Sequence, residues 1–185
     1  MLYVSRAGDK LAEAAKLFRV DFRGKTVLDI GSSTGGFTDF ALQNGAAKVI
    51  CIEKGTDQLS RSLHSDPRIE LHEKTDIFNF PSPLRSDMIL IDVSFVSLLK
   101  VLNHVQKNLA SPDTLILAML KPQFEAKSHE LVNGRIKNSK IRREIIKNFE
   151  SQIKPYFAIL NKHDNSLKGR EQNNQERFYL LNLIR

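Results

Sequence analysis

Two charged residues, Asp92 and Lys121, directly follow apolar runs that are typical of buried strands. Because neighbouring parallel strands end at the same edge of a sheet, we expect both side chains to lie together there. A lysine whose proton affinity is tuned by a carboxylate can help a weakly nucleophilic oxygen lose its proton. Taken singly, each residue could equally be a solvated surface charge. As a pair they predict a site of proton transfer.

A glycine-rich segment, Asp29–Gly36, lies where the first predicted strand turns into a helix. Gly31 and Gly35 are four positions apart, with Ser33 between them. This spacing differs from the G-x-G-x-x-G motif of dinucleotide-binding folds and from the phosphate-binding loop. It resembles the D-x-G-x-G-x-G loop of class I methyltransferases, with Ser33 in place of the middle glycine. A tight turn without any ligand is the alternative interpretation.

Two further acids follow the next predicted strands. Glu53 ends the second strand, where a carboxylate can accept hydrogen bonds from both hydroxyls of an adenosine ribose. Asp76 follows the third strand, where methyltransferases of this class often bind the adenine amino group. Simple exposure of Glu53 and a turn-forming role for Asp76 are the alternatives.

Apolar runs and helical spacing alternate along the chain, which predicts an α/β fold. The last two strands are separated only by a polar loop, so we expect them to pair antiparallel. The fold expected is therefore a doubly wound, mostly parallel sheet with an antiparallel last strand. The predicted strands cover residues 26–30, 48–53, 69–73, 87–93, 114–120, 156–161 and 177–184, and the predicted helices 11–18, 36–44, 58–64, 98–109 and 139–153, with a long polar stretch at 123–138.

The composition favours a single globular domain with an anionic partner. The chain has 185 residues, 41% of them hydrophobic, and a formal net charge of +7, which favours polyanions. Basic residues gather at 137–143 and 162–170, which suit nucleic acid or an acidic membrane surface but could also be ordinary solvated surface. Cys51 is the only cysteine, so neither an internal disulfide nor a thiolate-rich metal site is expected. No signal peptide or membrane-spanning run is recognisable, so we expect a cytoplasmic protein.

Four segments, in the same order along the chain, closely resemble the haemolysin A (TlyA-like) family, which is grouped with the FtsJ-like ribosomal RNA 2′-O-methyltransferases. They are Tyr3–Leu11, Leu28–Asp39, Ile91–Phe95 and Lys121–Glu125. The resemblance implies a class I, Rossmann-like fold that uses S-adenosylmethionine and methylates ribosomal RNA. It also implies a catalytic set of Lys10, Asp92, Lys121 and Glu176. The cofactor contacts that it implies are Asp29, Gly31, Ser33, Gly35, Gly36, Phe37, Glu53, Asp76 and Asp92, with no metal.

The chain departs from the family pattern in two ways. Family members usually begin with a small RNA-binding domain, and residues 1–185 are expected to be a single methyltransferase domain without it. The segment before Glu176 also differs from the usual Gly-Asn-x-Glu, since it reads Asn-Asn-Gln-Glu. Alternatives are methylation of a base or a protein, a non-catalytic module that binds cofactor or RNA, and a membrane-active haemolysin. The last is disfavoured because neither a spanning segment nor a strongly amphipathic free helix is recognisable.

Overall fold

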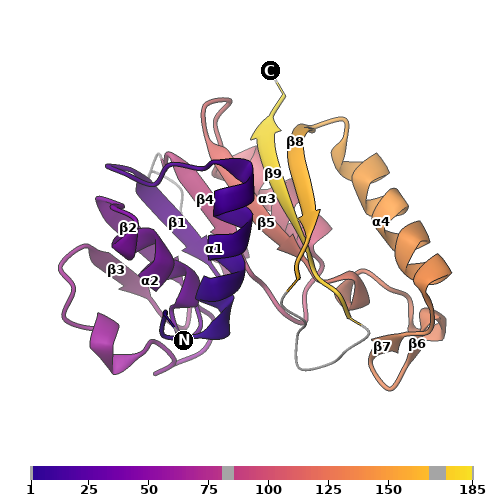
Figure 1. Ribbon diagram of the computed structural model, residues 1–185, viewed down its shortest axis with the longest axis horizontal. Helices are drawn as coiled ribbons and strands as arrows, with labels where there is room; N and C mark the ends of the chain where they lie inside the picture. The colour runs from indigo at the N-terminus through magenta and orange to yellow at the C-terminus, as the bar shows by residue number, and fades with distance from the viewer. Residues whose placement is uncertain (1, 81–85, 167–173, 185) are drawn as a thin grey trace.

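The computed structural model describes residues 2–80, 86–166 and 174–184, which build one seven-stranded sheet flanked by helices (Figure 1). The strand order is β3-β2-β1-β4-β5-β9-β8. The strands are β1 (Thr26–Ile30), β2 (Lys48–Ile52), β3 (Ile69–His72), β4 (Met88–Ile91), β5 (Leu115–Leu120), β8 (Phe157–Asp164) and β9 (Arg177–Leu183). The helices are α1 (Arg6–Phe18), α2 (Gly36–Gln43), α3 (Leu98–Asn108) and α4 (Ser139–Ile153).

The first five strands of this sheet are parallel, and β9 and β8 are added antiparallel at one edge. The mostly parallel α/β fold and its antiparallel last strand are therefore confirmed. From β1 the chain builds outward to β2 and β3, and it then returns to place β4 and β5 on the other side of β1. This reversal puts the carboxyl ends of β1 and β4 at the switch point, where open α/β sheets bind ligands.

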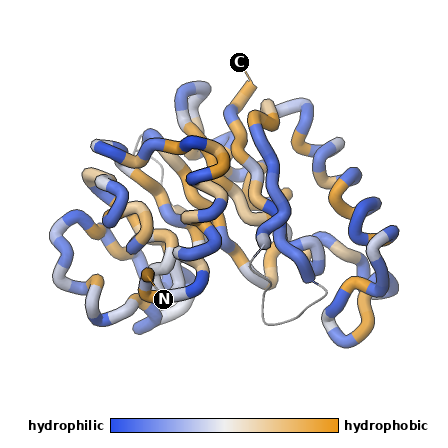
Figure 2. Tube along the Cα trace, viewed as in Figure 1, coloured by the Kyte–Doolittle hydropathy of each residue, from blue (hydrophilic) through white to orange (hydrophobic). Residues whose placement is uncertain are grey.

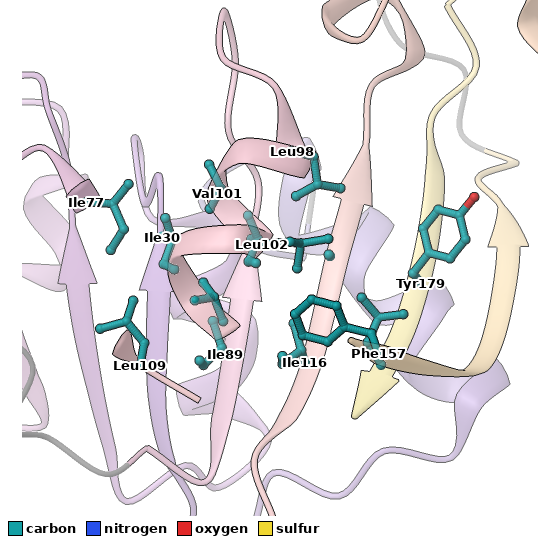
Figure 3. Packing of buried hydrophobic residues seen from close by; sticks show 14 of the residues in the cluster. Ile30, Ile77, Ile89, Leu98, Val101, Leu102, Leu109, Ile116, Phe157 and Tyr179 are labelled. Atoms are coloured by element: carbon teal, nitrogen blue, oxygen red, sulfur yellow. The ribbon is translucent and has the colours of Figure 1, made fainter. Parts of the chain in front are cut away.

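Strand alternation divides the core into two apolar layers. One layer packs beneath α1 and α2, and it includes Val27, Leu90 and Phe178. The other packs beneath α3 and α4, and Figure 3 shows part of it, including Ile89 of β4 and Leu102 of α3. The strands that contribute to both layers form the hydrophobic centre of the trace in Figure 2. Burial on both faces explains why the inner parallel strands are almost continuously apolar, whereas β3 at the edge of the sheet contains Glu70 and His72.

Helices α1 and α2 touch at two glycines. A Cβ atom on Gly8 would lie 2.8 Å from the carbonyl oxygen of Gly36, and one on Gly36 would lie 2.9 Å from the nitrogen of Gly8. Only glycine permits the backbones to approach so closely. The contact fixes the start of α1 against the start of α2, and Lys10 lies two residues beyond it.

The structure corrects two expected elements and adds detail to a third segment. The predicted helix at 58–64 is a single 3₁₀ turn, Arg61–Leu63. The polar stretch 123–138 is structured, because it contains two 3₁₀ turns and the hairpin β6 (Leu131–Val132) and β7 (Arg135–Ile136). Strand β8 runs on to Asp164, because β9 pairs with its polar end. Within the described residues, no helix combines the length and the apolarity needed to cross a membrane.

Candidate active site

Four charged residues project from the carboxyl edge of the sheet toward the face that α1 and α2 cover. They are Asp29 in β1, Asp92 after β4, Lys121 after β5 and Glu176 before β9. Alternate residues of a strand point to the same face. The residues two positions away pack in the α1–α2 layer: Val27, Leu90, Met119 and Phe178. The period of the strands thus directs all four charges to one side.

Lys121 and Asp92 form an ion pair at this edge. The Nζ of Lys121 lies 2.6 Å from Oδ1 of Asp92 and donates a hydrogen bond of 2.8 Å to Oγ of Ser94. The two charged side chains are only 13% and 16% exposed. Pro122 opens a 3₁₀ turn immediately after Lys121, so the chain turns away and leaves this ammonium at the rim.

Lys10 and Glu176 form a second ion pair, between α1 and the start of β9. Their Nζ and Oε2 atoms are 2.5 Å apart, and the side chains are 13% and 11% exposed. The antiparallel ladder of β5 and β9 ends with Leu120 opposite Arg177. One further register step places Lys121 opposite Glu176. The structure thus brings the four residues of the expected Lys-Asp-Lys-Glu set to one corner of the fold.

The glycine-rich loop is held in left-handed conformations. Gly31, Ser33 and Gly35 have φ values of 83°, 47° and 92°. A Cβ atom on Gly31 would lie 2.8 Å from the backbone oxygen of Asp92, so this position requires glycine. Glu53 fastens the loop, because its carboxylate accepts hydrogen bonds from the nitrogens of Ser33 (2.9 Å) and Gly55 (2.6 Å).

A cavity of about 650 Å³ lies beside this loop, within the size range of small-molecule sites. Its walls combine apolar side chains with the carboxylates of Glu53, Asp76 and Asp92. Asp76 accepts a hydrogen bond of 3.1 Å from the nitrogen of Phe78 and pairs with Lys54, so it forms a turn and also lines the cavity. Apolar walls for a flat ring and acceptors for hydroxyl and amino groups fit a nucleoside such as that of S-adenosylmethionine.

A smaller hollow of about 160 Å³ lies on the other side of the loop. Its lining includes Asp92, Lys121 and Gly36, and also Phe37, whose ring packs in the core 6.1 Å from that of Phe178. Gly31 and Asp92 line both spaces, so they separate the larger cavity from the lysine. A group bound in the smaller hollow would meet Lys121 on one side and the cavity on the other.

Asp29 is fully buried below the loop. Its Oδ2 accepts a hydrogen bond of 2.6 Å from Oγ1 of Thr38. Burial raises the pKa of Asp29 to about 7, and the charges of Asp92 and Glu53 add to this effect, while the Thr38 hydrogen bond opposes it. Asp29 therefore titrates near neutral pH at the base of the loop.

Sequence reasoning missed an aromatic pair beside the site. Phe95 lines the large cavity, is 92% exposed and has a φ of 63°. Its ring centroid lies 5.2 Å from that of Phe124, with 48° between the ring planes. Both residues lie within the segments of family resemblance, yet no periodicity in the sequence marks them as exposed.

The basic clusters are only partly free for a partner. Lys137, Lys140 and Arg143 are exposed at the start of α4. In contrast, Arg142 pairs with an aspartate and Lys162 with a glutamate, so neither is a free surface charge. Residues 167–170 of the second cluster lie outside the described residues. The described part of the chain contains no group of His, Cys, Asp or Glu side chains that could hold a metal ion.

Comparisons with known proteins show the family to which the chain belongs. The family model of FtsJ-like methyltransferases matches residues 3–182. The 23S rRNA (cytidine-2′-O)-methyltransferase TlyA of Campylobacter jejuni is 36% identical over 183 residues, which is 97% of this chain and 71% of that protein. YqxC of Bacillus subtilis is 40% identical over 151 residues, 78% of this chain but only 53% of the relative.

Solved structures support the same relationship. A Lactococcus lactis protein provisionally named a hemolysin has a TM-score of 0.90 at 37% identity, and the match covers 99% of this chain and 89% of that one. S-adenosylmethionine-dependent methyltransferases from Listeria monocytogenes and Mesorhizobium loti, 16% and 14% identical, share the fold alone, with TM-scores of 0.67 and 0.68.

The buried Asp29 generates a prediction about stability. Its pKa is about 7 in the folded protein and 3.8 when unfolded, so the folded state binds the proton more tightly. Its contribution to stability is therefore complete below pH 3.8 and is lost as the pH rises to about 7. We expect Asp29→Asn to gain stability relative to the wild type over this interval, by on the order of a few kcal/mol. Urea unfolding at a series of pH values measures this difference, and parallel curves for the two proteins would contradict it.

Proposed function

Because the chain belongs to the FtsJ-like methyltransferase family, we propose that it methylates the 2′-oxygen of a ribose in ribosomal RNA, with S-adenosylmethionine as the methyl donor. The observation that carries this proposal is the array of Lys10, Glu176, Lys121 and Asp92 beside a cavity of cofactor size. Lysines held by carboxylates suit chemistry at a hydroxyl oxygen. The name of the Campylobacter jejuni relative, which specifies cytidine 2′-O-methylation of 23S rRNA, supports the same substrate.

The cofactor supplies a methyl group on a positively charged sulfur. We propose that Glu53 binds the ribose hydroxyls and Asp76 the adenine amino group, since both carboxylates line the large cavity. Gly31 and Asp92 separate this cavity from Lys121, which suits a reacting group held between them. The remaining expected contacts, Asp29, Ser33, Gly35, Gly36 and Phe37, would shape the loop and the start of α2.

Lys121 is the residue proposed to act on the substrate oxygen. A ribose hydroxyl is a weak nucleophile. As its oxygen takes the methyl group from the sulfonium sulfur and its proton passes to solvent water, an adjacent ammonium would stabilise the negative charge that develops on the oxygen. Asp92 and Ser94 hold Nζ of Lys121 in place, so the group is positioned before substrate binds. Glu176, opposite Lys121 in register, anchors Lys10 as a second cation at the same corner.

The RNA itself would meet the exposed side chains around this corner. Lys137, Lys140 and Arg143 can neutralise phosphates, and the exposed ring of Phe95 beside Phe124 offers a stacking surface for an unpaired base. We propose that the chain acts as a single catalytic domain in the cytoplasm, where ribosomal RNA is found. The relatives are longer, and this chain spans only 53% of the Bacillus subtilis protein.

Cofactor binding should depend on Glu53. The wild type is expected to bind S-adenosylmethionine with micromolar-class affinity, about −8 kcal/mol. Glu53→Ala removes the ribose acceptor and the anchor of Ser33, so the affinity should fall at least about tenfold, as expected for a lost hydrogen bond to a charged group. Calorimetry measures both. Glu70→Ala, in the neighbouring strand and outside the cavity lining, is the matched control. Equal affinity of the Glu53→Ala variant and the wild type would remove Glu53 from the site.

Methyl transfer should depend on Lys121. Lys121→Ala should lower the single-turnover rate by ~10²-fold or more, the usual effect of losing a group that stabilises developing negative charge. Lys121→Arg should fail nearly as badly, because the planar guanidinium cannot take the place of the compact ammonium held by Asp92 and Ser94. The dissociation constant of the cofactor should barely change in either variant, and Lys100→Ala, an exposed lysine on α3, serves as the control. Near-wild-type transfer by Lys121→Ala would exclude this mechanism.

RNA binding should weaken with salt, because neutralised phosphates release counterions. Replacing Lys137, Lys140 and Arg143 together with Gln should reduce the slope of log affinity against log salt by roughly 2 for single-stranded RNA, about 0.7 per lost contact. Filter binding to ribosomal RNA fragments over a salt series measures the slope. Arg23→Gln, which breaks an exposed pair with Asp21, is the control. A flat salt dependence of the wild type would argue against phosphate contacts.

A further inference from the structure

We propose that Arg142 of α4 is a positioning residue that holds Glu176 in place for its contact with Lys10. The inference rests on the proposed function, in which Glu176 belongs to the site. In the sequence, Arg142 belongs to the basic cluster at 137–143, which is expected to bind RNA. The structure assigns it a different task, because its side chain is only 15% exposed and its hydrogen bonds go to the protein.

The contacts of Arg142 converge on the residues around Glu176. Its Nη2 donates hydrogen bonds to Oδ1 of Asp164 (2.8 Å) and to the carbonyl oxygen of Gln175 (3.0 Å). Its Nε donates a further bond of 3.3 Å to the same carbonyl. That carbonyl belongs to the peptide unit joining Gln175 to Glu176. The hydrogen bonds from Arg142 fix the orientation of this peptide unit, and so they fix the backbone on the N-terminal side of Glu176.

Asp164 and its neighbour Asn165 hold the backbone on the C-terminal side of Glu176. Asp164 and Arg177 are partners in the last pair of the β8–β9 ladder, and Arg177 donates bonds of 2.7 and 2.9 Å to the two carboxylate oxygens of Asp164. The next residue, Asn165, donates a hydrogen bond of 3.0 Å from its nitrogen to the carbonyl oxygen of Glu176. Arg142 and Asp164 thus hold the residues on both sides of Glu176.

Arg142, Asp164 and Arg177 form a clamp around Glu176, and the charges of this clamp are constant. Burial acts to raise the pKa of Asp164, but hydrogen bonds from Arg177 and Arg142 outweigh it and lower that pKa to about 2. The carboxylate is therefore ionised throughout the range in which methyl transfer would be measured. A change in activity between pH 6 and 9 cannot come from titration of Asp164.

The clamp works from the opposite face of the sheet. Arg177, like Tyr179 two residues later, faces α4, whereas Glu176 and Phe178 face α1. Lys10 attracts the Glu176 carboxylate from one side only, and Glu176 precedes the first residue of β9. Without Arg142, the Gln175 carbonyl loses its hydrogen bonds to α4, while Arg177 keeps only its longer contact with Glu150 of that helix, so the carboxylate should sample positions away from Lys10. A lysine cannot replace the guanidinium of Arg142, which donates from two nitrogens to two partners, because an ammonium is a compact point charge with a single nitrogen.

The test compares the coupling between Lys10 and Glu176 in two backgrounds. Urea unfolding is measured for four proteins: the wild type, Lys10→Met, Glu176→Gln and the double variant. The coupling is the factor by which the unfolding constant of the double variant departs from the value expected if the two substitutions acted independently. In the Arg142→Gln background this factor should fall at least about threefold, as expected for contacting residues that share a network. Arg142→Lys, which keeps the charge beside Asp164, provides a second and milder background.

Activity gives an independent measurement. In Arg142→Gln the turnover number should fall about tenfold or more while the KM for RNA stays constant, as for loss of a group that acts in the transition state. Adding Arg142→Gln to Glu176→Gln should cause no further loss. Lys147→Gln, an exposed lysine on the same helix, is the charge-matched control and should change neither the coupling nor turnover.

Two results would overturn the inference. One is an unchanged Lys10–Glu176 coupling in both Arg142 backgrounds. The other is a raised KM with unchanged turnover, which would make Arg142 an RNA contact. If the wild type does not methylate ribosomal RNA, the proposed function fails, but the unfolding cycle still decides whether Arg142 positions Glu176.

Discussion

The site depends on one geometric constraint, the two-residue period of the strands. Asp29, Asp92, Lys121 and Glu176 come from four different strand ends, and each continues the face of a residue buried beneath α1 and α2. A one-residue shift of β9 against β5 would turn Glu176 toward α4 and leave Lys10 without a partner. The apolar register of the sheet therefore determines which charges can meet. The chemistry of this corner is fixed by the packing of residues that take no part in it.

Because these side chains lie together and are mostly shielded from water, each lysine forms an ion pair with a carboxylate. Lysines that are only 13% exposed need a nearby carboxylate, because an unpaired ammonium in such a position loses most of its hydration. Asp92 and Glu176 meet this need from neighbouring elements. The site is thereby pre-organised, since the ammonium groups are in place before any substrate arrives. Such an arrangement costs little reorganisation during the reaction.

Local pattern predicted much of the fold and about half of the site. The parallel strands, the glycine loop and the acids at strand ends follow from periodicity and composition, so Asp92 and Lys121 could be paired from the sequence. Lys10 and Glu176 could be identified only by resemblance, because α1 meets β9 across 166 positions of the chain. The hairpin β6–β7 had a usable signal that was overlooked. Asn133-Gly134, with φ values of 50° and 73°, is a typical hairpin turn. Composition cannot distinguish a partly buried, paired guanidinium such as that of Arg142 from an exposed one, so its contacts could not be predicted from the basic cluster.

The distribution of charge separates two kinds of ligand. The chain carries +7 overall, yet the walls of its large cavity present three carboxylates, Glu53, Asp76 and Asp92, and a single cation, Lys54. A phosphate backbone is attracted to the exterior and repelled by these carboxylates, whereas a cationic nucleoside with free hydroxyls is favoured among them. Lys121 lies where the two regions meet, in the smaller hollow that shares Asp92 with the cavity. Under the proposed function, the net negative cavity would favour the sulfonium, whereas the exposed cations Lys137, Lys140 and Arg143 near the start of α4 would hold the polyanion outside it, which is the separation that methyl transfer between them requires.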